Sequence, residues 1–343
     1  MLLYGDSFVF CKGWKEMQIP EKNLGFELLR VTESAALAAA RWLGKGNKEQ
    51  GDGAAVDAMR LSFNSLSIKG QIIIGEGAKD KAPMLYNGEC VGDGTGPSID
   101  IAVDPIEGTN LLALGRPNAI AVIGACKAGY MFRPGSSYYM KKLVVGREAR
   151  DAVDIDAPVA DNLHAVARAL GKDINDLVVF VLDKPRHRGL VEEIRKTGAR
   201  ITLHSDGDVA GSLMAVDQSS EVDVMMGTGG TPEGVISACA IKGMGGQIFG
   251  RFDPQSEEER NAMIAEGTRL DEILTVDSII RSEDAFFAAT GISGGGFLAG
   301  VNFSGKGAVT HSLVIRAKTG TFRYLESHHN WERLMKFSSV RYD

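Results

Sequence analysis

The chain has 343 residues, 44% of them hydrophobic, and this length predicts two domains with enough apolar content to bury both cores. Lysine and arginine number 38 against 44 aspartate and glutamate, giving a net charge of -6 without a long basic block, which argues against a nucleic-acid-binding protein. No apolar run approaches the length of a membrane span and the amino terminus lacks the features of a secretion signal, so we expect a cytoplasmic protein that does not bind membranes.

The first structured element is expected after an amino-terminal extension. Residues 1–22 show no periodic pattern and are assigned to an extension of uncertain structure, with Met17 as an alternative start. From Leu24 the apolar spacing predicts an amphipathic helix that ends before Gly44.

Two acidic residues come next at the boundaries of predicted elements. Asp52 precedes a helix predicted over residues 54–66, at the place where an N-cap belongs, and on its own this structural interpretation is the stronger one. Glu76 follows a strand predicted over residues 71–74 and has a glycine on either side. An acid at the end of a buried strand has little use in packing, and the glycines on either side let other groups approach closely, so a functional role is favoured for Glu76.

Residues 100–110 contain two more acids. Their apolar run ends at Asp104, Pro105 is expected to stop the strand, and Glu107 precedes a helix that begins near Thr109. Two carboxylates on such a turn can bind a hard cation, and the first N–H groups of the helix can bind an anion. Taken alone, helix capping and compensation of the helix dipole explain the two acids equally well.

Further strands of the same sheet are predicted over residues 119–124 and 130–132, and Tyr139 follows them, close to Lys141 and Lys142. Aromatic residues in such a place usually serve packing. A phenol beside two ammonium groups is also suited to a phosphate, and both interpretations stay open at this point.

The domain boundary is predicted near Asp151, which divides the chain after the extension into residues 23–150 and residues 151–343. In the second part strands alternate with helices, the pattern of an open, mostly parallel sheet. Three strands are predicted here, over residues 177–182, 200–203 and 222–226, and each is followed by a cluster of polar residues.

The three clusters suit a phosphorylated sugar. Lys184 and Arg186 are cations of the kind that bind phosphate, although a solvated loop is the commoner fate of such a charge run. Asp206 and Asp208 can accept hydrogen bonds from sugar hydroxyls, and a glycine-rich segment leads to Glu233 in the first turn of a helix, where an acid commonly only compensates the dipole. Because ligands bind beyond the carboxyl ends of the strands in such sheets, we expect the clusters to share one crevice.

Several motifs in this order resemble one known family. The segment Asp104-Pro105-Ile106-Glu107-Gly108-Thr109 resembles the Asp-Pro-x-Asp/Glu-Gly-Thr signature of the lithium-sensitive, metal-dependent phosphatases. The likeness to the bacterial class II fructose-1,6-bisphosphatases runs from about Leu24 to Arg316. Its motifs lie at residues 31–36, 74–77, 82–86, 139–143, 184–187, 206–208 and 232–235.

The resemblance implies an α/β protein with a layered sugar-phosphatase fold. It would have an α+β metal-binding first domain, an α/β substrate-binding second domain, helices packed on two sheets, and an active site between the domains. The implied ligands of Mn²⁺ or Mg²⁺ are Asp52, Glu76, Asp104, Glu107 and Glu233. The implied substrate contacts are Glu107, Gly108, Thr109, Tyr139, Lys184, Pro185, Arg186, Asp206, Gly207, Asp208 and Gly230.

The implied activity is hydrolysis of the C1 phosphate of fructose 1,6-bisphosphate, a step of gluconeogenesis, by a metal-activated water. Asp104, Glu107 and Thr109 would be the catalytic residues, with Thr109 orienting or deprotonating the water. We also expect a homo-oligomer, either a dimer or a tetramer. Three features depart from the family: Gly51 stands where alanine is usual, the amino-terminal extension has no counterpart, and the tail after about Thr319 looks specific to this chain.

Three alternatives remain. A bifunctional enzyme would also act on sedoheptulose 1,7-bisphosphate. An inositol-monophosphatase-like enzyme is disfavoured by the Lys184 cluster and by Asp206 and Asp208. A non-catalytic sugar-phosphate sensor is disfavoured by the complete set of five acids.

Overall fold

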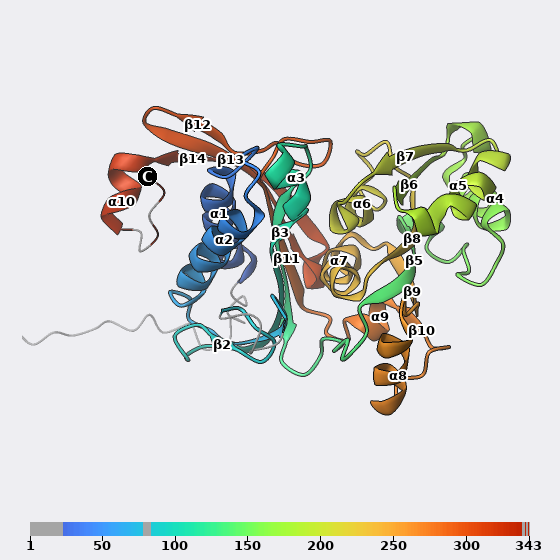
Figure 1. The fold of residues 1–343 in the computed structure, drawn as a ribbon, viewed down its shortest axis with the longest axis horizontal. Coiled ribbons are helices and arrows are strands. Elements are labelled where there is room, and N and C mark those ends of the chain that lie inside the picture. The colour runs from blue at the N-terminus through green and yellow to red at the C-terminus, as the bar shows by residue number, and fades with distance from the viewer. Residues whose placement is uncertain (1–22, 78–83, 338–339, 341, 343) are drawn as a thin grey trace, which may run out of the picture.

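The structure is a computed structural model that describes residues 23–77, 84–337, 340 and 342. The extension predicted at residues 1–22 lies outside the described residues, as do residues 82 and 83 of one of the motifs. Two β-sheets with helices packed on them form the described part of the molecule, which confirms the predicted α/β class (Figure 1).

The first sheet has the strand order β12-β13-β11-β4-β3-β1-β2, and β14 also pairs with β13. It is mixed, because β1 and β3 run parallel while the other pairs are antiparallel. Its strands are β1 (Lys69–Ile74), β2 (Cys90–Val91), β3 (Ser98–Glu107), β4 (Ile120–Lys127), β11 (Ala285–Gly291), β12 (Asn302–Ser304), β13 (Gly307–Arg316) and β14 (Thr321–Asn330).

Helices α1 (Gly25–Ala40) and α2 (Lys48–Phe63) cover one face of the first sheet (Figure 1). Strand β4 shows why both faces are buried. Ala121 and Ile123 join the hydrophobic core under α1 and α2, whereas Ile120 and Val122 join the core on the opposite face. This alternation is the two-residue period of a strand covered on both sides.

The second sheet has the order β10-β9-β5-β8-β6-β7. Its strands are β5 (Tyr139–Val145), β6 (Val178–Leu182), β7 (Arg200–His204), β8 (Val224–Gly230), β9 (Gln247–Phe252) and β10 (Ile273–Thr275). Helices α4 (Val159–Leu170) and α5 (Arg188–Lys196) pack on its outer face. The other helices are α3 (Thr109–Leu114), α6 (Asp208–Met214), α7 (Thr231–Met244), α8 (Glu257–Ala265), α9 (Val276–Ile279) and α10 (Trp331–Phe337), with short 3₁₀ turns η1 (Arg147–Ala149), η2 (Ile174–Asp176), η3 (Pro185–His187) and η4 (Ala317–Thr319).

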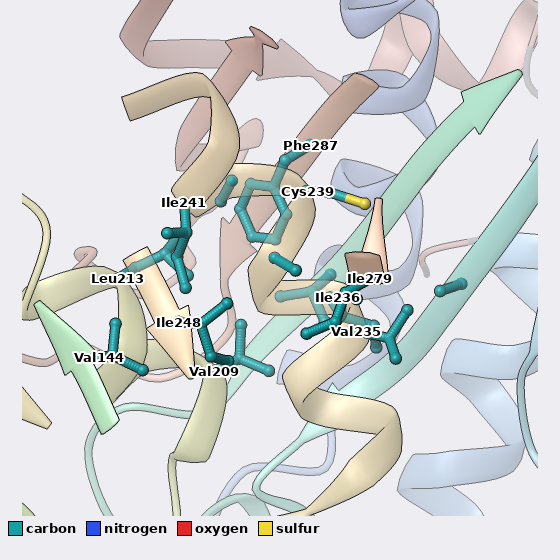
Figure 2. Packing of buried hydrophobic residues seen from close by; sticks show 14 of the residues in the cluster. Val144, Val209, Leu213, Val235, Ile236, Cys239, Ile241, Ile248, Ile279 and Phe287 are labelled. Carbon is teal, nitrogen blue, oxygen red and sulfur yellow. The ribbon is translucent and has the colours of Figure 1, made fainter. Parts of the chain in front are cut away.

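Helix α7 lies between the two sheets and joins them into one core (Figure 1). Val235, Ile236 and Cys239 of α7 are buried, and they pack in a cluster with Phe287 of β11 and Ile248 of β9 (Figure 2). A helix that is apolar on all sides is stable only when it is enclosed on all sides. The packing of α7 therefore fixes how the two sheets face each other.

The observed sheets correct three expectations. The second sheet is mixed rather than mostly parallel, because only the β6–β7 and β6–β8 pairs are parallel. The linear division near Asp151 does not describe the sheets, since β5 lies before it and belongs to the second sheet, while β11–β14 return to the first. Residues 130–132 form no strand but a single bridge between Met131 and Ile280.

Among the helices of the described residues, none combines the length and the hydropathy of a membrane span.

Candidate active site

A cavity of about 990 Å³ is lined by residues from both sheets. The lining includes all five predicted metal ligands and the predicted substrate-contacting residues other than Pro185. Pro185 begins the 3₁₀ turn η3 and stiffens the loop between Lys184 and Arg186. The expected common crevice is therefore found, and its lining carries both acids and cations.

Asp104, Glu107 and Thr109 are positioned by an irregular end of β3. The sequence predicted that the strand stops at Pro105, and this is wrong. The strand continues to Glu107, with a bulge opposite β4. A bulge suits a proline because the extra residue need not donate to the ladder. Gly108 then adopts φ 90°, and α3 begins at Thr109 as predicted. This turn brings the Asp104 and Glu107 carboxylates and the Thr109 hydroxyl into the same cavity.

Asp52 is not an N-cap. Helix α2 begins earlier than predicted, at Lys48, because the side chain of Asn47 accepts a hydrogen bond from the Gln50 N–H at 3.1 Å. Asp52 therefore lies in the second turn, where it caps nothing, and its carboxylate faces the cavity. The structural interpretation that the sequence favoured for Asp52 is wrong.

Glu76 follows β1 on a tight connection. The Glu76 N–H donates to the Leu85 carbonyl at 3.0 Å, and a Cβ atom at Gly75 would lie 1.9 Å from that same oxygen. Only glycine allows this close backbone approach. The glycine before Glu76 thus has the role that the sequence predicted for it.

Glu233 lies in the first turn of α7 and faces the cavity. A Cβ atom at Gly230 would lie 1.6 Å from Glu233 Oε2, and one at Gly229 would lie 1.9 Å from Asp208 Oδ2. These two glycines of β8 therefore leave space for two carboxylates against the backbone. This explains a glycine-rich segment that matches no phosphate-binding loop.

Electrostatic repulsion is concentrated in this part of the cavity. Burial raises the pKa of Glu76 to about 7, assisted by Asp52, and raises the pKa of Glu107 to about 8, assisted by Asp208 and Glu233. The pKa of Asp104 is also raised, by burial and then by Glu107, Glu76 and Glu233, and burial raises the pKa values of Asp52 and Glu233. Within the described residues none of the five predicted ligands forms a salt bridge.

One buried cation lies beside the acids. Lys142 of β5 is 1% exposed, and its Nζ donates to Asp208 Oδ2 at 2.6 Å. It also favours ionised Glu233, whose pKa it lowers against the effect of burial. This one ammonium group cannot balance all the site carboxylates once they are ionised, and a bound cation would neutralise the excess negative charge.

The donor set fits a hard divalent cation. Oxygen ligands are what Mg²⁺ and Mn²⁺ prefer, and the Oε2 atoms of Glu107 and Glu233 are buried without a hydrogen-bond partner among the described residues. As the side chains stand, no three His, Cys, Asp or Glu residues of the described ranges are gathered closely enough to hold a metal ion. The oxygens that a metal would use therefore line the cavity, but they do not converge on one position.

The cationic part of the cavity is held by hydrogen bonds. Lys184 Nζ donates to Asp206 Oδ1 at 3.1 Å. The guanidinium of Arg186 donates to the Thr228 carbonyl through Nε at 3.0 Å and Nη2 at 2.8 Å, and it lies 5.2 Å from the centre of the Tyr139 ring. The phenol, the ammonium and the guanidinium that the sequence singled out thus line the same cavity, with Arg186 beside Tyr139.

Comparison with known proteins agrees with the motifs. The family described as "Bacterial fructose-1,6-bisphosphatase, glpX-encoded" matches residues 22–329. "Fructose-1,6-bisphosphatase 1 class 2" of Escherichia coli K12 is 44% identical over 325 residues, covering 91% of this chain and 96% of that protein. "Fructose-1,6-bisphosphatase class 2" of Shigella flexneri has the same identity and coverage.

The chain belongs to this bacterial fructose-1,6-bisphosphatase family. The family match continues to residue 329, so the segment after Thr319 is not specific to this chain as far as that residue. That segment contributes β14, which pairs with β13 along the whole strand.

Sequence reasoning missed Lys142 as the buried partner of an acid. The signal was present, because Met140, Lys142 and Val144 share one face of β5 and the two apolar members belong to the core between the sheets. A lysine between two such positions must be buried and paired.

Proposed function

We propose that this member of the family hydrolyses the C1 phosphate of fructose 1,6-bisphosphate to fructose 6-phosphate and phosphate. One observation carries the proposal: five carboxylates with raised pKa values, without a salt bridge to any residue that the structure describes, line the same cavity as Lys184 and Arg186. A cavity that carries both a surplus of carboxylates and a lysine and an arginine suits a substrate with a metal-bridged phosphate and a second phosphate.

The acids would hold Mn²⁺ or Mg²⁺ through Asp52, Glu76, Asp104, Glu107 and Glu233. A divalent cation bound there would polarise the phosphate, neutralise charge on the leaving oxygen and lower the pKa of the attacking water.

The chain's own groups would orient the reaction. The Thr109 hydroxyl donates to the Ile106 carbonyl at 3.2 Å, so its oxygen can accept a hydrogen bond from the attacking water and orient it. The backbone N–H groups of Gly108 and Thr109 would hold the oxygens of the transferred phosphate. Asp104 is fixed by the Ile106 N–H, which donates to its Oδ1 at 3.0 Å.

The remote phosphate would be held by Tyr139, Lys184 and Arg186. Binding energy from this non-reacting group would position the C1 phosphate over the acids. Asp206 and Asp208 would accept hydrogen bonds from sugar hydroxyls between the two ends; Asp208 Oδ1 is buried without a partner among the described residues, which supports this role. Gly207, at φ 105°, is the N-cap residue of α6, so Asp208 lies in the first turn of that helix.

The finer assignments also belong to the proposal. We expect a cytoplasmic homo-oligomer, a dimer or tetramer, that uses manganese or magnesium and serves gluconeogenesis. We also expect fructose 1,6-bisphosphate to be preferred over sedoheptulose 1,7-bisphosphate and inositol monophosphate.

The test is phosphate release from fructose 1,6-bisphosphate by chelator-treated protein, with and without added manganese. We expect release to depend on the metal and to be lost in Asp52→Asn. The matched control is Asp57→Asn, because Asp57 is on the same helix but exposed and outside the cavity. Metal-independent release, or equal loss in both variants, would contradict the proposal, and a panel of the three substrates would decide among the phosphatase alternatives.

A further inference from the structure

Strands β6 and β8 separate beside the proposed phosphate-binding loop. Their parallel ladder ends at the pair Phe180–Met225, yet β6 runs on to Leu182 and β8 runs on alongside β5 to its end. The N–H and C=O groups of one strand residue point to the same side of the strand. Thr228 of β8 therefore presents both groups to the gap that β6 no longer fills.

The imidazole of His187 occupies this gap. The Thr228 N–H donates to His187 Nε2 at 2.8 Å, and His187 Nδ1 lies 2.6 Å from the Leu182 carbonyl oxygen. Because Nε2 accepts a hydrogen bond, the ring proton must be on Nδ1, where it donates to Leu182. The neutral ring thus replaces a strand-to-strand hydrogen bond with a donor and an acceptor of its own.

The surroundings keep the ring neutral and in place. His187 is 4% exposed, and burial lowers its pKa, with the Arg186 guanidinium acting in the same direction. Gly227 has φ 134°, and a Cβ atom there would lie 3.0 Å from His187 Nε2. Only glycine at this position gives both the backbone conformation and the space for the ring.

The other backbone group of Thr228 holds Arg186. Its carbonyl accepts from Nε and Nη2 of that guanidinium, and the remaining N–H groups belong to a side chain that lines the cavity. Two consecutive residues of one loop therefore hold the backbone of Thr228: His187 accepts a hydrogen bond from its N–H, and Arg186 donates to its C=O. Any rotation of Thr228 would redirect Arg186.

We propose that His187 is a positioning residue: it bridges the separated ends of β6 and β8 and so keeps Arg186 directed at the remote phosphate of the substrate. The inference deepens the proposed function and rests on it for the identity of that phosphate. His187 touches no substrate; it acts through Thr228 and Arg186.

Two amide variants separate this role from general packing. An asparagine amide reaches the place of Nδ1 and keeps only the bond to Leu182, whereas a glutamine amide reaches the place of Nε2 and keeps the bond to Thr228. We expect His187→Asn to raise KM for fructose 1,6-bisphosphate about tenfold with little change in kcat, which corresponds to one misplaced charged hydrogen bond. We expect His187→Gln to restore most of the affinity. The control is His204→Gln, a half-buried imidazole of β7 that stacks on Phe180 and should leave KM unchanged.

A double-mutant cycle tests whether the effect passes through Arg186. In an Arg186→Ala background, His187→Asn should change KM no further, because the guanidinium that it positions is absent. An equal effect in both backgrounds would overturn the inference, as would a wild-type KM in His187→Asn. Nitrogen NMR of labelled histidine should also show Nε2 unprotonated at pH 8; a protonated Nε2 would contradict the geometry.

Binding of the product keeps this inference separate from the proposed function. Calorimetry with fructose 6-phosphate needs no turnover, and its dissociation constant should rise in His187→Asn and recover in His187→Gln. If wild-type protein binds the product but releases no phosphate from the bisphosphate, the proposed activity fails and the calorimetric comparison alone decides on His187. Equal product affinity in the wild type and both variants would overturn the inference.

Discussion

Glu107 should make the metal-free protein less stable than it would be with a neutral side chain. It is 4% exposed, and its pKa is raised from 4.5 to about 8. The folded protein therefore binds this proton more tightly than the unfolded chain between these two pH values. The free energy of unfolding must therefore fall as pH rises from about 4.5 to about 8. Over this range Glu107 of the unfolded chain is already ionised, whereas the folded protein still holds the proton.

The size of the effect follows from the same pKa. The difference between 4.5 and about 8 is equivalent to about 5 kcal/mol at pH 8 or above, which sets an upper bound. Rearrangement of the neighbouring carboxylates reduces this, and we expect Glu107→Gln to stabilise the metal-free protein by about 2–3 kcal/mol at pH 8. Glutamine keeps an oxygen for the Val209 N–H, which donates to Glu107 Oε1 at 3.4 Å, and its amide can donate to nearby acids.

The assay is urea denaturation in the presence of a chelator at pH 5 and pH 8, together with phosphate release in manganese. Glu107→Gln should match the wild type at pH 5, exceed it at pH 8 and lack activity. Manganese should stabilise the wild type at pH 8 far more than the variant. The exposed Asp57→Asn serves as the control and should change neither property. A Glu107→Gln protein that is less stable than the wild type at pH 8, or that keeps its turnover, would refute the reasoning.

Three further predictions concern the same site. Lys142→Met should lower the free energy of unfolding by about 3–5 kcal/mol, because it leaves a buried carboxylate unpaired; chemical denaturation measures this, and an unchanged midpoint would count against the buried pair. Gly230→Ala should weaken manganese binding and activity at least tenfold, since the new Cβ would displace Glu233. The control is Gly189→Ala, whose Cβ would meet no atom within 4 Å and which should change neither property. Calorimetry compares manganese binding by the two variants. At limiting manganese, phosphate release should rise with pH through about 7 to 8, where two site carboxyls lose protons that compete with the metal, and excess manganese should move the rise to lower pH. A pH profile that is independent of manganese concentration would exclude this competition.

Local sequence patterns predicted the elements that depend on neighbours in the chain. The glycine before Glu76, the helix at Thr109 and the strands β6 and β7 follow from backbone freedom and apolar spacing alone. Asp52 shows where such reasoning fails. The cap is Asn47, five residues earlier, which the sequence reasoning did not consider, so Asp52 lies inside the helix and lines the cavity.

Strand pairing was beyond the local pattern. Strand β5 follows β4 in the chain, but it inserts between β8 and β9 in the other sheet, with Tyr139 opposite Gly230. Nothing near residue 139 specifies that partner, because the pairing depends on segments that come about 90 to 110 residues later. The insertion makes the sheet mixed and brings Lys142 beside Asp208, so the missed topology and the missed counter-ion have one cause.

The central claim is that five carboxylates share one cavity in order to bind the divalent cation that hydrolysis requires. The most direct measurement is an anomalous difference map from crystals grown with manganese. We predict at least one manganese peak in the cavity, within about 2.0–2.3 Å of carboxylate oxygens that include those of Asp104, Glu107 and Glu233. A map without a peak in the cavity, from protein that hydrolyses fructose 1,6-bisphosphate in the same manganese solution, would contradict the account.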